Sequence, residues 1–151
     1  MDYLLDTNIV IIYSKSKDLA SQIEKDYQLF VEENNLAISI VSLAEINSII
    51  HQFRIGDKRR SGIDKILDKT TKLDISYDDI LQKYEEIDAY SQGRYQSKTS
   101  NFTAINMGKN DLWIAATASA FDLTLVTTDK DFMHLEGEFL NLIFVDLNKY
   151  R

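Results

Sequence analysis

The sequence predicts an α/β layered fold with a mainly parallel sheet. Short apolar runs alternate along the chain with longer segments of helical periodicity, which is the pattern of successive β-α units. The apolar runs are continuous, as expected for strands that are covered on both faces. With 151 residues, no proline, five glycines and no internal repeat, the chain is expected to form one domain over residues 1–151.

Each element follows from a local pattern. Short apolar runs predict strands at residues 3–5, 36–40, 73–75, 123–127 and 142–145. Apolar residues at helical spacing predict helices at residues 9–13, 17–33, 43–53, 63–67, 78–90 and 111–121. The last of these helices is apolar nearly all round, which predicts that it is buried. Residues 91–109 are rich in Ser, Thr, Asn and Gly and are expected to form a loop.

Capping residues predict where some of the helices begin and end. Ser42 is a candidate N-cap, with Glu45 three residues later in the capping-box position. Gly56 is expected to end the same helix. Ser76 or Asp78 is expected to begin the helix that precedes the polar loop.

Composition excludes several classes of function. The chain has 24 acidic and 17 basic residues and a net charge of −7, so a general electrostatic coat for nucleic acid is not expected. Without cysteine there is no disulfide, thiolate metal site or cysteine nucleophile. His51 and His134 are too few for a multi-histidine metal site, and neither is assigned a catalytic role. No apolar run approaches the ~18 residues of a membrane span and the N-terminus lacks a basic signal region, so we expect a cytoplasmic protein.

Four acidic residues lie at the rim of predicted buried surface instead of on polar helix faces. Asp6 and Asp129 follow apolar strands, and the carboxyl ends of parallel strands are where ligands bind. Glu45 has apolar neighbours one helical turn away on each side, and Asp111 opens the most apolar helix. Each alone has an ordinary explanation as a turn or capping residue. Asp129, for example, could cap a short turn of helix at residues 130–133.

Together the four carboxylates indicate a cation site. Like charges that share a site repel one another and raise each other's pKa values, and a divalent cation is the simplest compensation. Ligands that are all oxygen suit Mg²⁺ or Mn²⁺ better than zinc or copper. The spacing in the sequence does not establish that the four residues meet in space.

Four segments carry a family resemblance. They are YLLDTNI at residues 3–9, SLAEI at 42–46, NDLWIAATA at 110–118 and LVTTDKDF at 125–132. On these segments the chain resembles PIN-domain ribonucleases, most closely the VapC-type toxins of bacterial toxin–antitoxin pairs. The stretch between residues 54 and 109 carries no motif of that family.

The resemblance implies a small three-layer α/β/α sandwich and a metal-dependent endoribonuclease. It implies that one or two Mg²⁺ or Mn²⁺ ions are held by a catalytic quartet, Asp6, Glu45, Asp111 and Asp129. Residues expected to support this quartet are Thr7, Asn8, Thr127 and Asp131. Asp131 is ranked below Asp129, because the family's motif places the site acid two residues after Thr127.

The resemblance also implies protein partners. VapC-type toxins form homodimers and are held inactive by a cognate antitoxin, whose extended tail can direct a basic side chain at the acidic pocket. A pocket of uncompensated carboxylates is a natural docking point for arginine. Ile49, Ile50 and Phe53 could line a groove for that tail, although core packing is the commoner use of such residues.

An RNA substrate has to be held despite the negative net charge. The residues that could contact RNA are Arg54, Lys58, Arg59, Arg60 and Lys109. Taken singly, each has a simpler explanation as part of a solvated helix end or loop.

Two other functions stay open. The first is a catalytically degenerate PIN-fold module that binds RNA without cleaving it. The second is a receiver-like, Mg²⁺-binding signalling domain, which would have paired acids after its first strand and a lysine after its last. A haloacid-dehalogenase phosphatase would need Asp-x-Asp, where this chain has Asp6-Thr7-Asn8. The sequence names neither the RNA nor the site of cleavage.

Overall fold

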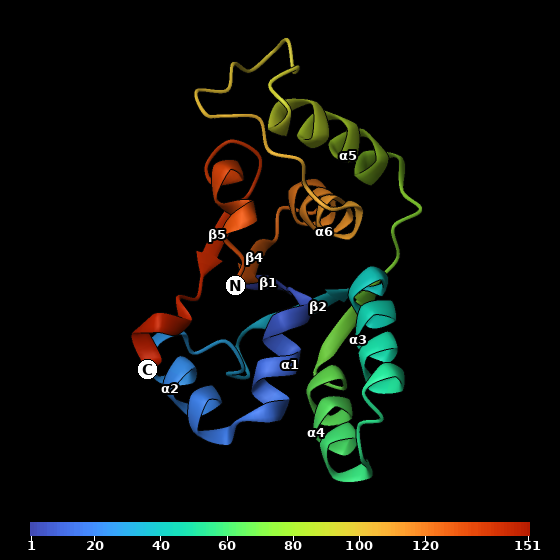
Figure 1. Ribbon diagram of the computed structural model, residues 1–151, viewed down its shortest axis with the longest axis vertical. Helices are drawn as coiled ribbons and strands as arrows, with labels where there is room; N and C mark the ends of the chain where they lie inside the picture. The colour runs from blue at the N-terminus through green and yellow to red at the C-terminus, as the bar shows by residue number, and fades with distance from the viewer.

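The computed structural model describes residues 1–151 and is built around one sheet of five strands (Figure 1). The strands are β1 (Asp2–Leu5), β2 (Asn35–Ser39), β3 (Thr70–Leu73), β4 (Thr124–Thr127) and β5 (Asn141–Phe144). Their order across the sheet is β3-β2-β1-β4-β5, and every neighbouring pair is parallel. The prediction of a mainly parallel sheet is therefore confirmed.

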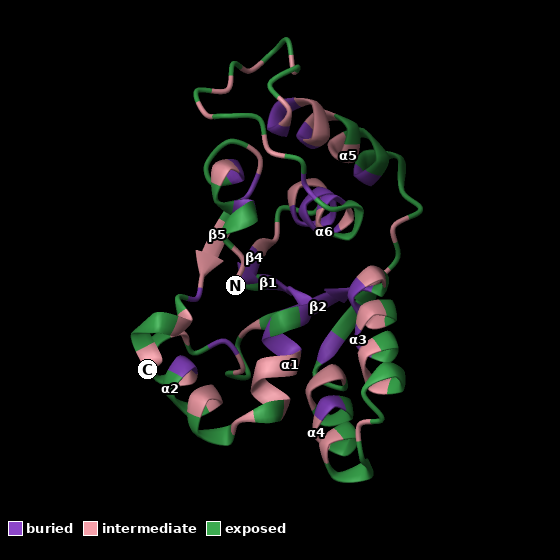
Figure 2. Ribbon diagram, in the orientation of Figure 1, coloured by how far each residue is buried: buried purple, intermediate pink, exposed green.

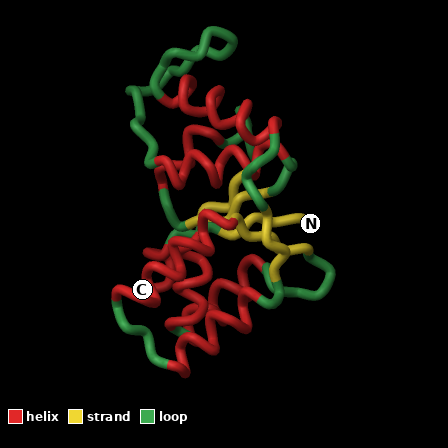
Figure 3. Tube along the Cα trace, turned by 90° about the vertical axis from the view of Figure 1, so that its right-hand side faces the viewer, coloured by secondary structure: helices red, strands yellow, loops and turns green.

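Helices cover both faces of the sheet. They are α1 (Thr7–Lys15), α2 (Lys17–Tyr27), α3 (Ile40–Gln52), α4 (Asp57–Leu67), α5 (Asp78–Ser91) and α6 (Lys109–Ala120), with 3₁₀ helices η1 (Lys130–Leu135) and η2 (Leu147–Tyr150). Figures 1 and 3 show α5 and α6 on one side of the strands and α1, α2 and α4 on the other. This arrangement confirms the three-layer α/β/α sandwich. No helix is both long enough and apolar enough to cross a membrane.

The core divides according to the alternation of side chains along the strands. Leu4 and Leu125 pack with buried residues of α5, α6 and η1, whereas Leu5 and Val126 pack with residues of α1 and α2. Figure 2 shows that much of the central sheet and of α6 is buried. Because successive side chains in a strand point to opposite faces, the central strands bury side chains on both faces of the sheet. Helix α3 contacts both α1 and α6, so it connects the two helical layers.

The predicted helix over residues 17–33 is wrong at its C-terminal end. Helix α2 stops at Tyr27 because Gln28 adopts a left-handed conformation with φ of 49°. The carboxylate of Glu24 then accepts hydrogen bonds from the backbone N–H groups of Leu29 and Phe30, at 3.2 and 3.1 Å. A side chain therefore replaces the helical hydrogen bonds over these residues.

The predicted capping box is also wrong. Helix α3 begins at Ile40, and its N-cap is Ser39, whose hydroxyl accepts the N–H of Val41 at 3.1 Å. Ser42 is buried inside the first turn, and Glu45 lies in the second turn, where its carboxylate is free of any capping role. Helix α3 ends at Gln52, and Gly56 instead precedes α4 as its N-cap.

The remaining differences arise where solvent exposure hides the pattern. Strand β3 occupies residues 70–73 instead of 73–75, because it is an edge strand with Thr71 and Lys72 exposed. Helix α4 starts at Asp57, six residues before the predicted start at residue 63, since its first turns are polar. Residues 92–108 contain no helix or strand, as predicted.

We expect Glu24 to stabilise the end of α2 measurably. Its carboxylate accepts three hydrogen bonds, one from the Tyr13 hydroxyl at 2.8 Å and two from the backbone after the helix. Replacing Glu24 with Ala should lower the free energy of unfolding by about 1–3 kcal/mol in urea titrations, despite the higher helix propensity of alanine. The matched control is Glu33→Ala, an exposed glutamate without a hydrogen bond. Equal stabilities of the two variants would contradict this role.

Candidate metal centre

The site lies at the carboxyl ends of the two central strands. From β1 the chain crosses to β2 on one side, and from β4 it crosses to β5 on the other. Such a reversal of strand order opens a crevice, and open α/β sheets bind ligands at this point. The residues that follow β1 and β4 are therefore placed where a ligand can reach them.

Asp6 is the most buried acid of the site, with 4% of its surface exposed. Its backbone N–H donates to the carbonyl of Val126 at 2.9 Å, which fixes it beside β4. Its carboxylate accepts the N–H of Thr7 at 2.8 Å, as the N-cap of α1, and the hydroxyl of Thr127 at 2.6 Å. Burial raises the pKa of Asp6 above its usual value, although these two hydrogen bonds oppose the shift.

Glu45 is held by the start of a different helix. The hydroxyl of Thr7, in the first turn of α1, donates to one carboxylate oxygen of Glu45 at 3.0 Å. The second carboxylate oxygen makes no hydrogen bond, and the side chain is half-buried. Thr7 therefore links Asp6 to Glu45, across 38 residues of sequence.

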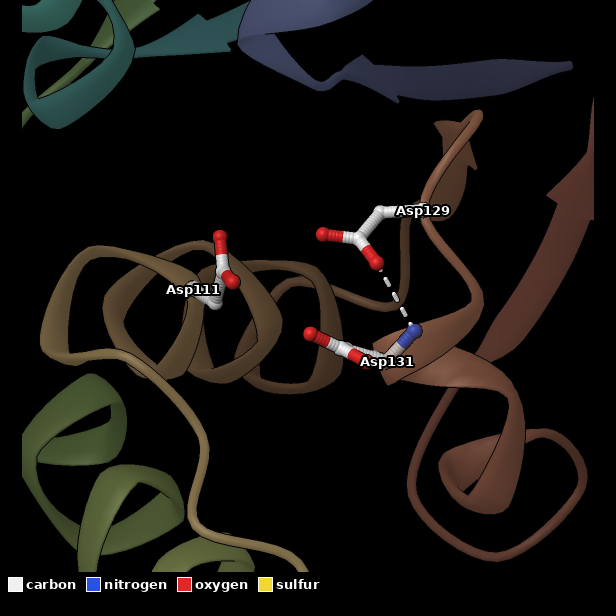
Figure 4. A group of neighbouring side chains, drawn as sticks. All are labelled: Asp111, Asp129 and Asp131. Atoms are coloured by element: carbon white, nitrogen blue, oxygen red, sulfur yellow. Dashed lines mark hydrogen bonds between the residues drawn. The ribbon is translucent and has the colours of Figure 1, made fainter.

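Asp129 and Asp131 are positioned by the turn after β4. The N–H of Asp129 donates to the hydroxyl of Thr127 at 3.0 Å, and Asp129 accepts the N–H of Asp131 at 2.9 Å (Figure 4). Asp129 is thus the N-cap of η1, as one explanation from the sequence predicted. At the other end of η1, the ring of His134 hydrogen-bonds the hydroxyl of Ser91 at 2.7 Å and ties the turn to α5.

Asp111 faces this turn from α6. Ligand oxygens of Asp111, Asp129 and Asp131 all lie within 4.8 Å of one another, and the three carboxylates point into one space (Figure 4). Burial, and then the charges of Asp6, Asp129, Glu45 and Asp131, raise the pKa of Asp111 to about 7. Five carboxylates therefore share one electrostatic environment. Asp111 itself lies in the first turn of α6, which Gly108 caps.

These residues fit a hard divalent cation. Every candidate ligand is a carboxylate oxygen, and the carboxylates oppose one another's ionisation. A bound Mg²⁺ or Mn²⁺ would offset the repulsion between the carboxylates, and carboxylate oxygens are the ligands that these ions prefer. The site contains no cysteine or histidine that would favour a softer metal.

The supporting residues predicted from the sequence differ in what they contact. Thr7 and Thr127 each hydrogen-bond a carboxylate of the site. Asn8 is exposed in the first turn of α1 and hydrogen-bonds none of the acids. Asp131, ranked lower from the sequence, belongs to the tight group of three around Asp111. Its position two residues after Asp129 was the available signal, because the Asp129 cap turns the chain back toward α6.

An apolar groove adjoins Glu45, and the sequence did not indicate most of it. It measures about 500 Å³ and is lined by Val41, Ala44, Glu45, Ser48, Ile49, Ile75, Asn110 and Trp113. Of the three groove residues expected on α3, only Ile49 lines it. Ile50 lies elsewhere on the helix, and Phe53 is exposed beyond its end. Trp113 comes from α6, so sequence spacing alone gave no reason to pair it with α3.

The predicted RNA-contacting residues lie in two places. Lys109 is exposed at the start of α6, two residues before Asp111. Arg54, Lys58, Arg59 and Arg60 cluster at the turn from α3 into α4, at the end of α3 far from the sheet (Figure 1). That turn lies outside the acidic group, because Gln52 already stands about 10 Å along the helix axis from Glu45.

Residues 3–138 of the sequence match the family model of the PIN domain. The chain belongs to the PIN domain family. The resemblance seen in the four sequence segments is thereby confirmed, and the receiver-like and phosphatase interpretations are set aside. The strand order agrees, because receiver-like sheets have the order 2-1-3-4-5.

Individual relatives are similar over the full chain. Ribonuclease VapC2 of Rickettsia felis is 28% identical over 99% of this chain and 100% of the relative. The structure of VapBC2 from Rickettsia felis bound to a DNA fragment from its promoter has a TM-score of 0.74 and 26% identity, covering 97% of this chain and 100% of that one. VapBC-1 from nontypeable Haemophilus influenzae has the same fold, with a TM-score of 0.62 and 24% identity over 95% of this chain and 98% of that one.

Neutralising Asp111 should stabilise the metal-free protein. Its pKa is raised from 3.8 to about 7, so the folded state binds more protons than the unfolded state between these pH values. The contribution of Asp111 to the stability of the wild type should therefore fall as pH rises through this window. In Asp111→Asn the stability should change less steeply with pH. At pH 8 in chelator this variant should melt at a higher temperature than the wild type.

The control for this measurement is Asp64→Asn, which neutralises an exposed aspartate of α4. Mn²⁺ should raise the melting temperature of the wild type and of this control, and should stabilise Asp111→Asn much less. A variant Asp111→Asn that melts below the wild type in chelator at pH 8 would contradict repulsion at the site.

Proposed function

We propose that this chain is a cytoplasmic, divalent-metal-dependent endoribonuclease and the toxin of a type II toxin–antitoxin pair. The observation that carries the proposal is the group formed by Asp111, Asp129 and Asp131, joined by the charges of Asp6 and Glu45. It occurs in a PIN domain that is similar along its whole length to a protein named as a ribonuclease. A module that had lost catalysis would have no need to keep repelling carboxylates together.

We assign the metal to Asp6, Glu45, Asp111 and Asp129, with Asp131 as an additional candidate ligand. Carboxylate oxygens of Asp111, Asp129 and Asp131 lie close together. The negative charges of Asp6 and Glu45 help to raise the pKa of Asp111, so they too face this group. One or two bound Mg²⁺ or Mn²⁺ ions would supply charge neutralisation at the scissile phosphate and activation of water. The proposed reaction is hydrolysis of an RNA phosphodiester bond.

The hydrogen bonds of the site suggest separate roles for its acids. Both carboxylate oxygens of Asp6 accept hydrogen bonds, so its orientation is fixed and it is the anchor of the group. Glu45 keeps one oxygen without a hydrogen bond while Thr7 orients the other, so Glu45 is the residue best placed to accept a proton from water. Thr127 holds Asp6 and the backbone of Asp129 at the same time, and maintains the spacing between them.

Purified protein should cleave cellular RNA into discrete fragments in Mn²⁺ or Mg²⁺ and should be inactive in chelator. Asp111→Asn should lower the rate at least ~100-fold, because the group loses a charged ligand. Gel analysis with end-mapping measures both the rate and the cut sites. Asp6→Ala should abolish cleavage and keep the fold.

Asp64→Asn is again the matched control and should cleave at the wild-type rate. Folded protein, free of any bound partner, that binds RNA but cleaves none under either metal would favour the degenerate RNA-binding module. Cleavage by Asp6→Ala at the wild-type rate would contradict the site itself.

We further propose a homodimer and an antitoxin that docks in the groove beside Glu45. The support is the likeness to VapBC2 of Rickettsia felis, together with the apolar lining of the groove next to the acids. Ile49 and Trp113 offer apolar surface, and the neighbouring carboxylates attract a basic side chain. A segment that carries both apolar and basic residues therefore matches this region of the surface.

Sedimentation equilibrium should give about twice the chain mass of 17.4 kDa for the purified protein. Co-expression with the product of a small adjoining gene should give a heavier complex without RNase activity. Trp113 is the single tryptophan of the chain and lines the groove. Subtracting the fluorescence emission of the Trp113→Phe complex from that of the wild-type complex gives the emission of Trp113, which should change when the antitoxin docks in the groove. An inhibited complex in which Trp113 emission is unchanged would place the antitoxin elsewhere.

A further inference from the structure

The turn between α3 and α4 borders a second, open hollow, separate from the acidic site. It measures about 820 Å³ and is lined by Asn47, Ile50, His51, Gln52, Arg54, Ile55 and Arg60. No carboxylate is among these residues, although the chain as a whole has a net charge of −7. The hollow is therefore a local region of positive charge on an acidic protein.

The two arginines of the hollow are free to bind a ligand. Arg54 and Arg60 are exposed and form neither an ion pair nor a hydrogen bond through their side chains. Arg54 adopts a left-handed conformation with φ of 49°, which turns the chain from α3 into α4. Because of this turn, Arg54 and Arg60 line the same hollow. A pair of free guanidinium groups suits the oxygens of a phosphate diester.

A strip without acidic residues connects the hollow to the acidic site. Ala44, Asn47, Ser48 and His51 form the exposed side of α3. From Glu45 to His51 the helix rises about 9 Å, a distance that a few nucleotides can span. A strand whose scissile phosphate lies at the acids therefore meets no negative charge on α3 before it reaches Arg54.

We propose that this hollow is a phosphate-binding subsite for single-stranded RNA, which holds nucleotides a short distance from the cleaved bond. The inference rests on the proposed endoribonuclease function and deepens it. RNA is favoured over an acidic peptide because the strip from the hollow ends at Glu45, where the RNA would be cleaved. Of the basic cluster, Arg54 and Arg60 line the hollow, whereas Lys58 and Arg59 do not.

The test measures the binding of a fluorescein-labelled single-stranded oligoribonucleotide in chelator, with Asp111→Asn as the parent so that no cleavage occurs. Arg54→Gln with Arg60→Gln should weaken binding about 10-fold or more. The slope of log K against log salt should become shallower by ~0.7 for each phosphate that the variant no longer neutralises. Glutamine is compatible with the backbone at position 54, because Gln28 has the same φ of 49°.

The matched control is Lys25→Gln with Lys65→Gln, which removes the same charge from two exposed lysines outside the hollow. Its affinity and salt slope should equal those of the parent, and circular dichroism should show the same fold for all proteins. If the parent binds RNA and the arginine variant binds it equally well, the subsite is overturned while the nuclease stands.

Two further results would also overturn the subsite. Polyglutamate that binds the parent and not the arginine variant, with RNA binding unchanged, would assign the hollow to an acidic protein ligand. Wild-type protein that neither binds RNA nor cleaves it in Mn²⁺ would remove the proposed function and the subsite together. Cleavage by the wild type therefore distinguishes failure of the subsite from failure of the nuclease.

Discussion

Mutual repulsion among carboxylates gathered around the buried Asp6 is the constraint on which this site depends. Burial and four neighbouring charges raise the pKa of Asp111 to about 7, and no lysine or arginine forms an ion pair with these acids. The chain's three ion pairs, between Lys83 and Glu86, Lys98 and Glu138, and Lys149 and Asp26, all lie away from the site. Hydroxyl and backbone N–H groups hold the acids in place without neutralising them. Without a cation this repulsion is relieved only by protonation, so a metal or a basic group of a partner can supply the neutralising charge.

The sequence predicts an element well where burial produces a run of apolar residues. It predicts poorly where a contact with a residue distant in the sequence determines the local structure. The central strands and the buried helix α6 are continuous apolar runs, and the acids that follow β1 and β4 could be located from them. Edge strand β3 has exposed polar residues and so no such pattern. The capping box at Ser42 was a sound local expectation, but Ser39 caps one turn earlier and Glu45 is held by Thr7, 38 residues away. Convergence of the acids depends on the order of the strands, which no local spacing encodes.

In the proposed function, chemistry and substrate binding are separated along α3. Its N-terminal turns carry Glu45 toward the acids, and its far end leads into the hollow that Arg54 lines. A polyanion is repelled by the acidic group until a cation binds, whereas the hollow attracts it with or without metal. A protein with a net charge of −7 can thus hold RNA without placing arginines among the acids, where they would pair with the carboxylates and displace the metal.

The same electrostatics explains why inhibition by a partner is easily achieved on this surface. The apolar groove shares Glu45 with the acidic site, so a segment seated against Ile49 and Trp113 lies beside the carboxylates. A guanidinium group from that segment would supply the positive charge that the acids lack, and it would form hydrogen bonds with their carboxylates. A metal ion could then bind only by breaking those hydrogen bonds. Partner and metal then compete for the same carboxylates, while apolar contacts in the groove add affinity that the metal does not have. A site built to need an external cation is, for that reason, open to control by any partner that brings one.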